Sequence, residues 1–246
     1  MVDVPHRLKK DGIVEALFEV RFTSSTIPEI YIGQLVAGIS TIMPGLAIER
    51  LPVADLPFPM RRGDPNLAFQ PTLQLKNEPT TRIARIGEMV VSWHALAPYP
   101  GWEVFAPEIR QVFDLVAKSV DQISISRVGF RYLNLLKPAD HHIQGLTDLT
   151  LDVLIGGEAL DIPLNVAYQR DLEGQRMTVR IATPEFVQTP VTDFSLLLDI
   201  DMNTDGKKCP SPDAVIEWVE VAHKLLKQEF FTLLKPEILH SLVEDS

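Results

Sequence analysis

Charged side chains alternate with apolar ones along two stretches of the sequence, 13–22 and 123–136. The charged positions are Glu15, Glu19 and Arg21 in the first stretch and Arg127 and Arg131 in the second. Because side chains two residues apart on a strand share one face, each stretch predicts a half-buried strand. If the two strands pair, the glutamates lie opposite the arginines, Glu15 by Arg131 and Glu19 by Arg127, on a solvent-facing surface.

Such a ladder of charges has two interpretations. It could bind a polar ligand, or the opposed charges could satisfy each other across the strands, at about 0.2–1 kcal/mol per pair. An arginine left without a carboxylate would favour anion binding, because a guanidinium holds a carboxylate or phosphate through two parallel hydrogen bonds. The five residues of the ladder are therefore candidate ligand-binding residues.

A second candidate is the segment Pro98-Tyr99-Pro100-Gly101-Trp102. Its prolines and glycine restrict the chain where a strand is expected to give way to a helix, and its two aromatic rings could offer a rigid contact area to a partner. Trp102 is also the first apolar residue of the expected helix, so it could instead pack against the sheet. Of the pair, Tyr99 is expected to be the exposed member.

Other reactive residue types lack the neighbours that their chemistry needs. Segment 201–206 begins like a calcium-binding loop, but Pro212 stands where the twelfth-position glutamate belongs. His141-His142 could bind a metal with Asp140 only if a further ligand came from elsewhere. The sequence contains no nucleophile elbow, P-loop or dinucleotide-binding fingerprint, and Cys209 lies in no motif that lowers a thiol pKa. We therefore predict no metal, no cofactor and no catalytic residue.

The elements that must position the candidate residues follow from hydrophobic periodicity. In the first half of the chain the periodicity predicts a strand, a helix, four strands and a helix, over 13–22, 27–43, 46–53, 67–76, 80–87, 88–96 and 102–121. The second half predicts a strand, an ambiguous segment, three strands and a helix, over 123–136, 146–155, 162–170, 176–183, 194–201 and 211–230. A helical turn follows Pro236, residues 57–65 form a loop, and Ser211 caps the last long helix.

This order of elements predicts an α+β fold. Residues 1–121 and 122–246 would be two similar β-α-β4-α halves of one compact unit, sharing a continuous curved antiparallel sheet with helices packed on one face. Such a tandem pseudo-repeat has the architecture of the TATA-box-binding-protein class. The alternative is a helix-grip fold, in which a curved antiparallel sheet wraps a long C-terminal helix around a cavity.

The composition indicates a globular cytoplasmic protein. Of the 246 residues 46% are apolar and 23% charged, which excludes disordered and fibrous classes. A single cysteine excludes an internal disulfide and fits a reducing cytosol. The N-terminal residues have charges but no apolar core of the signal-peptide type, and no apolar run of about 18 residues occurs, so we expect a protein that is neither exported nor membrane-spanning. The net charge of −10 makes nucleic acid an unfavourable partner.

Three segments resemble a known family: IVEALFEVRF at 13–22, PYPGWEVF at 98–105 and RVGFRYLN at 127–134. The family is a sporadically distributed, functionally uncharacterised group of bacterial and archaeal proteins of about this length. The resemblance spans most of the chain, including 198–201 and 231–242, and it carries over no catalytic residue. Its patchy occurrence is that of laterally acquired genes, which implies a prokaryotic protein in a defence or toxin–antitoxin setting.

These observations leave three hypotheses for function. The leading one is a non-enzymatic binding module that offers its solvent-facing sheet surface, an edge or a loop to a protein partner or small ligand, and that could form a homodimer. The second is an enzyme using the carboxylates and arginines Glu15, Glu19, Arg127 and Arg131. The third is nucleic-acid binding through a saddle-shaped sheet, which rests on fold analogy and which the net charge disfavours.

Overall fold

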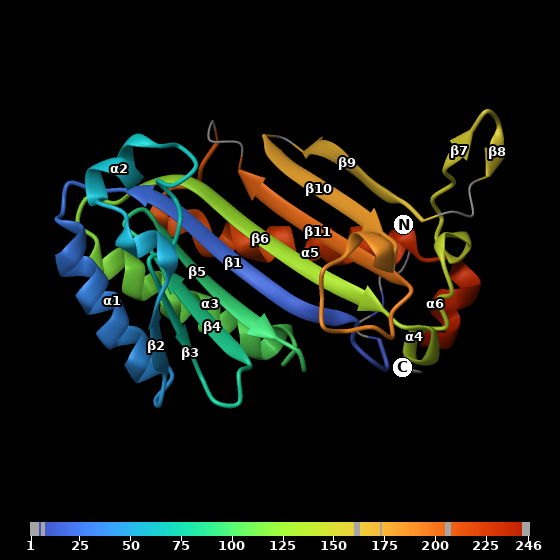
Figure 1. Ribbon diagram of the computed structural model, residues 1–246, viewed down its shortest axis with the longest axis horizontal. Helices are drawn as coiled ribbons and strands as arrows, with labels where there is room; N and C mark the ends of the chain where they lie inside the picture. The colour runs from blue at the N-terminus through green and yellow to red at the C-terminus, as the bar shows by residue number, and fades with distance from the viewer. Residues whose placement is uncertain (1–4, 6–7, 160–162, 173, 205–207, 243–246) are drawn as a thin grey trace.

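The computed structural model describes residues 5, 8–159, 163–172, 174–204 and 208–242. Nine strands of this part of the chain form one sheet, in which every neighbouring pair is antiparallel. The order across the sheet is β2-β3-β4-β5-β1-β6-β11-β10-β9. The predicted α+β class with an antiparallel sheet is confirmed, and the sheet stays open and does not close into a barrel (Figure 1).

The strands of this sheet are β1 Ile13–Thr23, β2 Ala47–Arg50, β3 Leu73–Lys76, β4 Arg82–Ile86, β5 Val90–Leu96, β6 Ser124–Leu136, β9 Asn165–Leu172, β10 Gln175–Ala182 and β11 Leu196–Thr204. A separate hairpin consists of β7 Leu154–Ile155 and β8 Glu158–Ala159. The helices of the described residues are α1 Pro28–Ile42, α2 Phe58–Gly63, α3 Trp102–Ser119, α4 Pro138–His141, α5 Val215–Leu233 and α6 Pro236–Leu242.

The main hydrophobic core lies between the sheet and the helices on one of its faces. In β1 that face consists of Ala16, Phe18, Val20 and Phe22, all fully buried. Figure 1 shows α3 and α5 behind the sheet, so the opposite face is turned toward the viewer. Alternation along each strand therefore separates an apolar face under the helices from a polar face, which we call the open face.

The open face is covered at both of its ends. Segment 51–72, which contains α2, lies over one end of β1, where the guanidinium of Arg21 sits 5.1 Å from the ring centre of Phe69. At the other end a second, smaller apolar cluster forms, in which Phe194 of the 183–195 connection packs against Leu135 of β6. Between these two segments the middle of the sheet remains open (Figure 1).

Local signals set the ends of the helices. α1 begins at Pro28, because the first turn needs no N–H at that position, and Gly45 turns the chain with a φ of 78° soon after the helix ends. Gly101, with a φ of 92°, precedes α3 in a conformation that favours glycine. The prediction that Ser211 caps the last long helix is wrong, because a 3-10 turn intervenes before α5 and the Ser211 side chain makes no capping hydrogen bond.

Tertiary contacts override the local pattern in three segments. Residues 57–65, predicted as a loop, contain α2, and Arg61 of this helix forms an ion pair with Glu88 between β4 and β5. The strand predicted over 67–76 is shortened to β3. The ambiguous segment 146–155 resolves into a 3-10 turn followed by β7. The short helix α2 has no periodic signal of its own in the sequence.

Gly87, in the turn between β4 and β5, provides a test of the packing of segment 51–72 against the sheet. A Cβ atom at this position would lie 2.7 Å from the backbone oxygen of Gln70. We expect Gly87→Ala to lower the free energy of unfolding by about 1–3 kcal/mol, measured by urea denaturation. Gly33→Ala in α1 is the control, because open space surrounds that position. It should raise stability by up to about 1 kcal/mol. Equal stability of the two variants would contradict this packing.

Candidate functional site

The structure brings the predicted charged residues together on the open face, but with a different register. Opposite Glu19 lies Gly129, and opposite Arg131 lies Leu17. Glu15 is paired with Leu133, so neither glutamate has an arginine directly across from it. The predicted pairing of Glu15 with Arg131 and of Glu19 with Arg127 is therefore wrong as a register. The register differs by two residues from the predicted one, so Glu19 and Arg127 meet diagonally across the two strands.

Each of these arginines nevertheless has a carboxylate partner. Glu19 accepts a hydrogen bond from Nη1 of Arg127 at 2.5 Å and one from Nε of Arg21 at 2.8 Å. Arg131 forms two parallel hydrogen bonds of 2.6 Å with Asp199 of β11. Asp199, which stabilises the guanidinium, raises the pKa of Arg131. Mutual satisfaction of charges, the plainer of the two interpretations, accounts for these three arginines.

Glu15 belongs to a different arrangement, a buried hydrogen-bond chain on the open face. Its Oε1 lies 2.6 Å from Nδ1 of His94, and Nε2 of the same ring lies 2.8 Å from Oγ of Ser92. Serine, histidine and carboxylate follow in the order that nucleophilic catalysis uses. However, Ser92 is 5% exposed, and strands β4 and β1 flank β5 on both sides, so its backbone amides serve the sheet and not an oxyanion. This hydrogen-bond network therefore satisfies the polar groups of buried side chains and is not a catalytic triad.

The aromatic segment before α3 lies at a cavity. Tyr99, expected to be exposed, is 9% exposed, and this expectation is wrong because its ring packs edge-on against Phe105 and Tyr132. Trp102 contacts the sheet at Phe130, with ring centres 5.6 Å apart. Its other face stacks on His223 of α5, at 3.9 Å and nearly parallel. Trp102 thus joins α3, α5 and the sheet.

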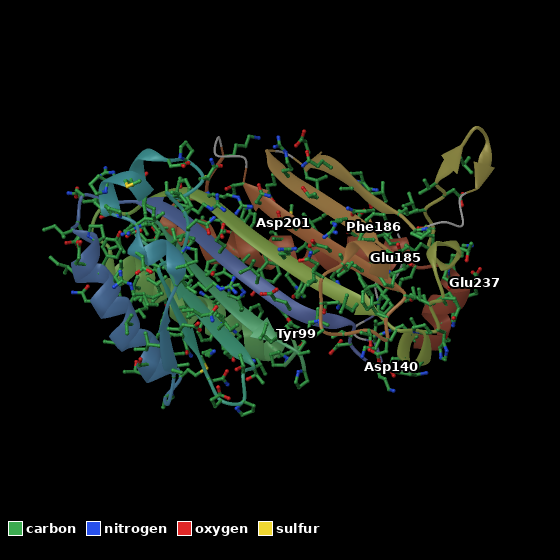
Figure 2. The ribbon with its side chains drawn as sticks, in the orientation of Figure 1. Tyr99, Asp140, Glu185, Phe186, Asp201 and Glu237 are labelled. Carbon is green, nitrogen blue, oxygen red and sulfur yellow. The ribbon has the colours of Figure 1, made fainter. Side chains whose placement is uncertain are left out.

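The cavity has a volume of about 350 Å³ and opens between the start of α3, α5 and the strands β1 and β6. Aromatic rings from these elements line it: Tyr99, Trp102, Tyr132, Phe230 and Phe231. Figure 2 labels Tyr99 beyond the end of β5, at the turn that leads into α3. An apolar cavity of this size with a few converging polar groups is the usual form of a small-molecule site.

A chain of three polar groups runs along the cavity wall. The hydroxyl oxygens of Tyr99 and Tyr132 lie 3.2 Å apart, and the Tyr132 hydroxyl lies 2.9 Å from Nδ1 of His223. Burial lowers the pKa of His223 to about 4, helped by the positive charges of Lys227 and Lys224. The imidazole is therefore neutral near pH 7. Burial also raises the pKa of Tyr132 well above its ordinary value, so its hydroxyl keeps its proton.

These protonation states allow the cavity wall to donate a hydrogen bond to a ligand. When Tyr99 donates to Tyr132 and Tyr132 donates to Nδ1, the proton of the imidazole resides on Nε2. Among the described residues this Nε2 has no hydrogen-bond partner, so it can donate to an acceptor on a ligand. His223 and Tyr132 were not predicted as site residues from the sequence. His223 lies on the apolar face of a helix and Tyr132 on the apolar face of a strand. From the sequence pattern alone, each residue is explained as part of the hydrophobic core.

The remaining candidates do not assemble a metal site. Within the described ranges no group of three or more histidine, cysteine or acidic side chains is placed to hold a metal ion. His141 is buried in α4, where its Nδ1 accepts a hydrogen bond from the backbone N–H of Lys137. The start of the calcium-like segment, 201–204, belongs to strand β11, whereas 205 and 206 lie outside the described residues. In the part of the chain that the structure covers, every helix is too short or too polar to span a lipid bilayer.

Comparison with models of known families and with the sequences of curated proteins gave no match for this chain. The resemblance of three of its segments to a known family therefore stays a prediction. The geometry of the two faces of the sheet is the basis for inferring the function of the protein.

The ion pair of Arg131 with Asp199 leads to an asymmetric prediction. Removing the guanidinium leaves a carboxylate that is only 10% exposed without its donors, whereas removing the carboxylate leaves a guanidinium that is 37% exposed and can be hydrated. We expect Arg131→Met to lower the free energy of unfolding by about 2–3 kcal/mol and Asp199→Asn by about 1 kcal/mol, in urea denaturation at pH 7. Equal losses, or the reverse order, would show that the pair is not desolvated as described.

The Glu15–His94 contact predicts a pH dependence. The hydrogen bond from His94 is the largest cause that lowers the pKa of Glu15, so the folded state holds this proton more weakly than the unfolded state does. The resulting stability is present above the ordinary pKa of the carboxyl and is lost as the pH falls through the lowered value. We expect Glu15→Gln to cost about 1 kcal/mol at pH 7 and progressively less as the pH falls below the ordinary pKa of the carboxyl. A cost independent of pH in thermal or urea unfolding would contradict the contact.

Proposed function

We propose that the protein is a non-enzymatic, cytosolic binding module that holds a small ligand in the cavity between α3 and α5. The observation that carries this proposal is the stack of Trp102 on His223 at 3.9 Å beside a cavity of about 350 Å³. A neutral imidazole held by a hydroxyl is a recognition group, and the cavity is large enough for a ligand of one or two rings.

The lining indicates the class of ligand. The rings of Trp102 and Phe231 in the lining favour a planar, largely apolar molecule, because it would bury apolar area against them. The Nε2 donor of His223 favours a hydrogen-bond acceptor on that molecule. A buried site that forms a hydrogen bond with one polar group of its ligand discriminates strongly against molecules that lack this group.

We also propose that the chain is one folding unit built from two similar halves of the TATA-box-binding-protein type. The sheet order supports this, because β1, β5, β4 and β3 follow outward from the centre as β6, β11, β10 and β9 do. The helices α3 and α5 close the two halves, and the cavity lies where these helices meet. A laterally acquired defence or toxin–antitoxin setting remains our proposal for its biological context, on the resemblance of 13–22, 98–105 and 127–134 alone.

The two alternative functions receive less support. An enzyme that uses Glu15, Glu19, Arg127 and Arg131 would need at least one of these groups ready for a substrate, and each is engaged in a hydrogen bond to another side chain or an ion pair. Binding of nucleic acid would bring a polyanion to a chain whose net charge is −10. A protein partner or a second copy of the chain could still bind together with the ligand.

Calorimetric titration with quinoline and indole tests the cavity and its polar group together. The two molecules have similar sizes, but quinoline offers a ring-nitrogen acceptor and indole an N–H donor. We expect quinoline to bind more tightly, and His223→Leu to weaken quinoline about tenfold while changing indole much less. Trp102→Ala should weaken both, because it removes part of the apolar wall of the cavity and the ring that stacks on His223.

Val221→Ala is the matched control, since Val221 lies on the same helix as His223 but is 42% exposed. It should leave both affinities unchanged. Binding of either probe that survives both His223→Leu and Trp102→Ala would place the ligand elsewhere and overturn the proposal. Failure of both probes to bind the wild-type protein would do the same.

A further inference from the structure

The open face contains a second hollow that the cavity between the helices does not explain. Its volume is about 380 Å³, and it extends across strands from β1 to β9. Small side chains form its floor, at Gly129, Ala167 and Thr178. Because these residues hardly rise above the sheet, the longer charged side chains around them become walls. In Figure 2 one of these, Asp201, is labelled on β11 on the face turned toward the viewer.

The charges of this hollow do not cancel. Its charged lining consists of the guanidinium groups of Arg21, Arg127, Arg131 and Arg180 and the carboxylates of Glu19, Asp199 and Asp201. Two of the carboxylates, Glu19 and Asp199, are held by arginines at 2.5–2.8 Å. The third, Asp201, lies 3.7 Å from Arg127. Four cations thus face three anions, and the surplus positive charge can be assigned to one residue.

That residue is Arg180 of β10. Its Nε donates to the side-chain oxygen of Asn165 at 2.8 Å, and its Nη2 donates to the backbone carbonyl of Phe186 at 3.0 Å. Both partners are uncharged. Among the described residues no carboxylate lies within ion-pair distance of this guanidinium, and its Nη1 has no hydrogen-bond acceptor. Arg180 is therefore oriented by neighbours that leave its charge uncompensated.

The two neighbours fix the guanidinium in a way that suits a ligand. Asn165 comes from the edge strand β9, and Phe186 from the connection that follows β10, so Arg180 is held from two sides. Figure 2 labels Phe186 at the end of β10, beside the open face. A guanidinium that is already oriented loses less side-chain entropy when an anion binds to it. Solvent has access to the group, because Arg180 is only partly buried.

We propose that this hollow binds the anionic group of a small ligand, a carboxylate or a phosphate, on the guanidinium of Arg180. A single anionic group would balance the surplus charge of the hollow and occupy the donors that the chain itself leaves unused. This site lies on the face opposite the cavity of Trp102 and His223, so the inference goes beyond the proposed function and does not rest on it.

Calorimetric titration at low ionic strength with inorganic phosphate and with succinate tests the proposal and separates the two sources of the anion. We expect at least one of them to bind the wild-type protein with a dissociation constant below about 10 mM. Arg180→Gln should weaken this binding at least about tenfold, because a charged hydrogen-bonding partner of the anion is lost. The tighter of the two probes identifies the ligand's anionic group.

Arg176→Gln is the matched control. Arg176 lies on the same strand and the same face, but it pairs with Asp171 and lies outside the hollow. Its loss removes the same overall charge and should change the affinity less than about twofold. An equal weakening by both variants would mean that general electrostatic attraction, and not a site, holds the anion, and this would overturn the proposal.

Two further measurements show whether Arg180→Gln loses binding because the site is lost or because the variant misfolds. Arg180→Lys keeps the charge but loses the planar fork, so it should bind more weakly than wild type and more tightly than Arg180→Gln. In the unmodified protein, the Arg180 side-chain N–H resonance should shift on addition of the binding anion, while that of Arg131 stays in place. No binding of either anion, or a shift at Arg131 alone, would also overturn the proposal. Trp102→Ala should leave the anion affinity unchanged, which separates this result from the test of the cavity.

Discussion

The antiparallel pairing of β1 with β6 determines the chemical character of both faces of the sheet. Phe18 lies opposite Phe130, and Val20 lies opposite Val128, on the face that the helices cover. The residues between them necessarily point the other way, because successive side chains of a strand alternate. A slip of one strand by one residue would bury the charged side chains of that strand and expose its aromatic rings. The register is therefore the constraint on which both sites depend.

The same alternation separates two kinds of recognition chemistry. Tyr132 of β6 points toward the helices, where burial keeps its hydroxyl protonated and allows it to hold the neutral ring of His223. Arg131, its neighbour in sequence, points toward the open face and is neutralised by Asp199. An apolar cavity and a charged hollow thus lie on opposite sides of one sheet. The cost of burying charge keeps them apart, since an ion pair would be poorly stabilised under the helices.

Much of the architecture could be predicted from the sequence, and the reasons are local. The alternating pattern at 13–22 and 123–136 predicted the central strands β1 and β6. The helical spacing at 102–121 predicted α3, and the order of these elements along the chain followed. The details of the sites could not be predicted, because they depend on register and on contacts between distant residues. Arg131 meets Asp199 and not Glu15, and Tyr99 is buried by Tyr132 and Phe105, 33 and 6 residues along the chain. His223 had no motif to mark it, since its role comes from the stack on Trp102.

The β1–β6 register directs Tyr132 toward α5, where burial keeps His223 neutral and the Tyr132 hydroxyl forms a hydrogen bond with its ring. Nitrogen NMR of histidine side chains across a pH titration measures this directly. We expect His223 to keep its proton on Nε2 and to stay neutral until the pH approaches about 4. The Tyr132→Phe variant should lose the preference for that tautomer. Titration of His223 with an ordinary midpoint near 6.5, or no response of its tautomer to Tyr132→Phe, would contradict the account.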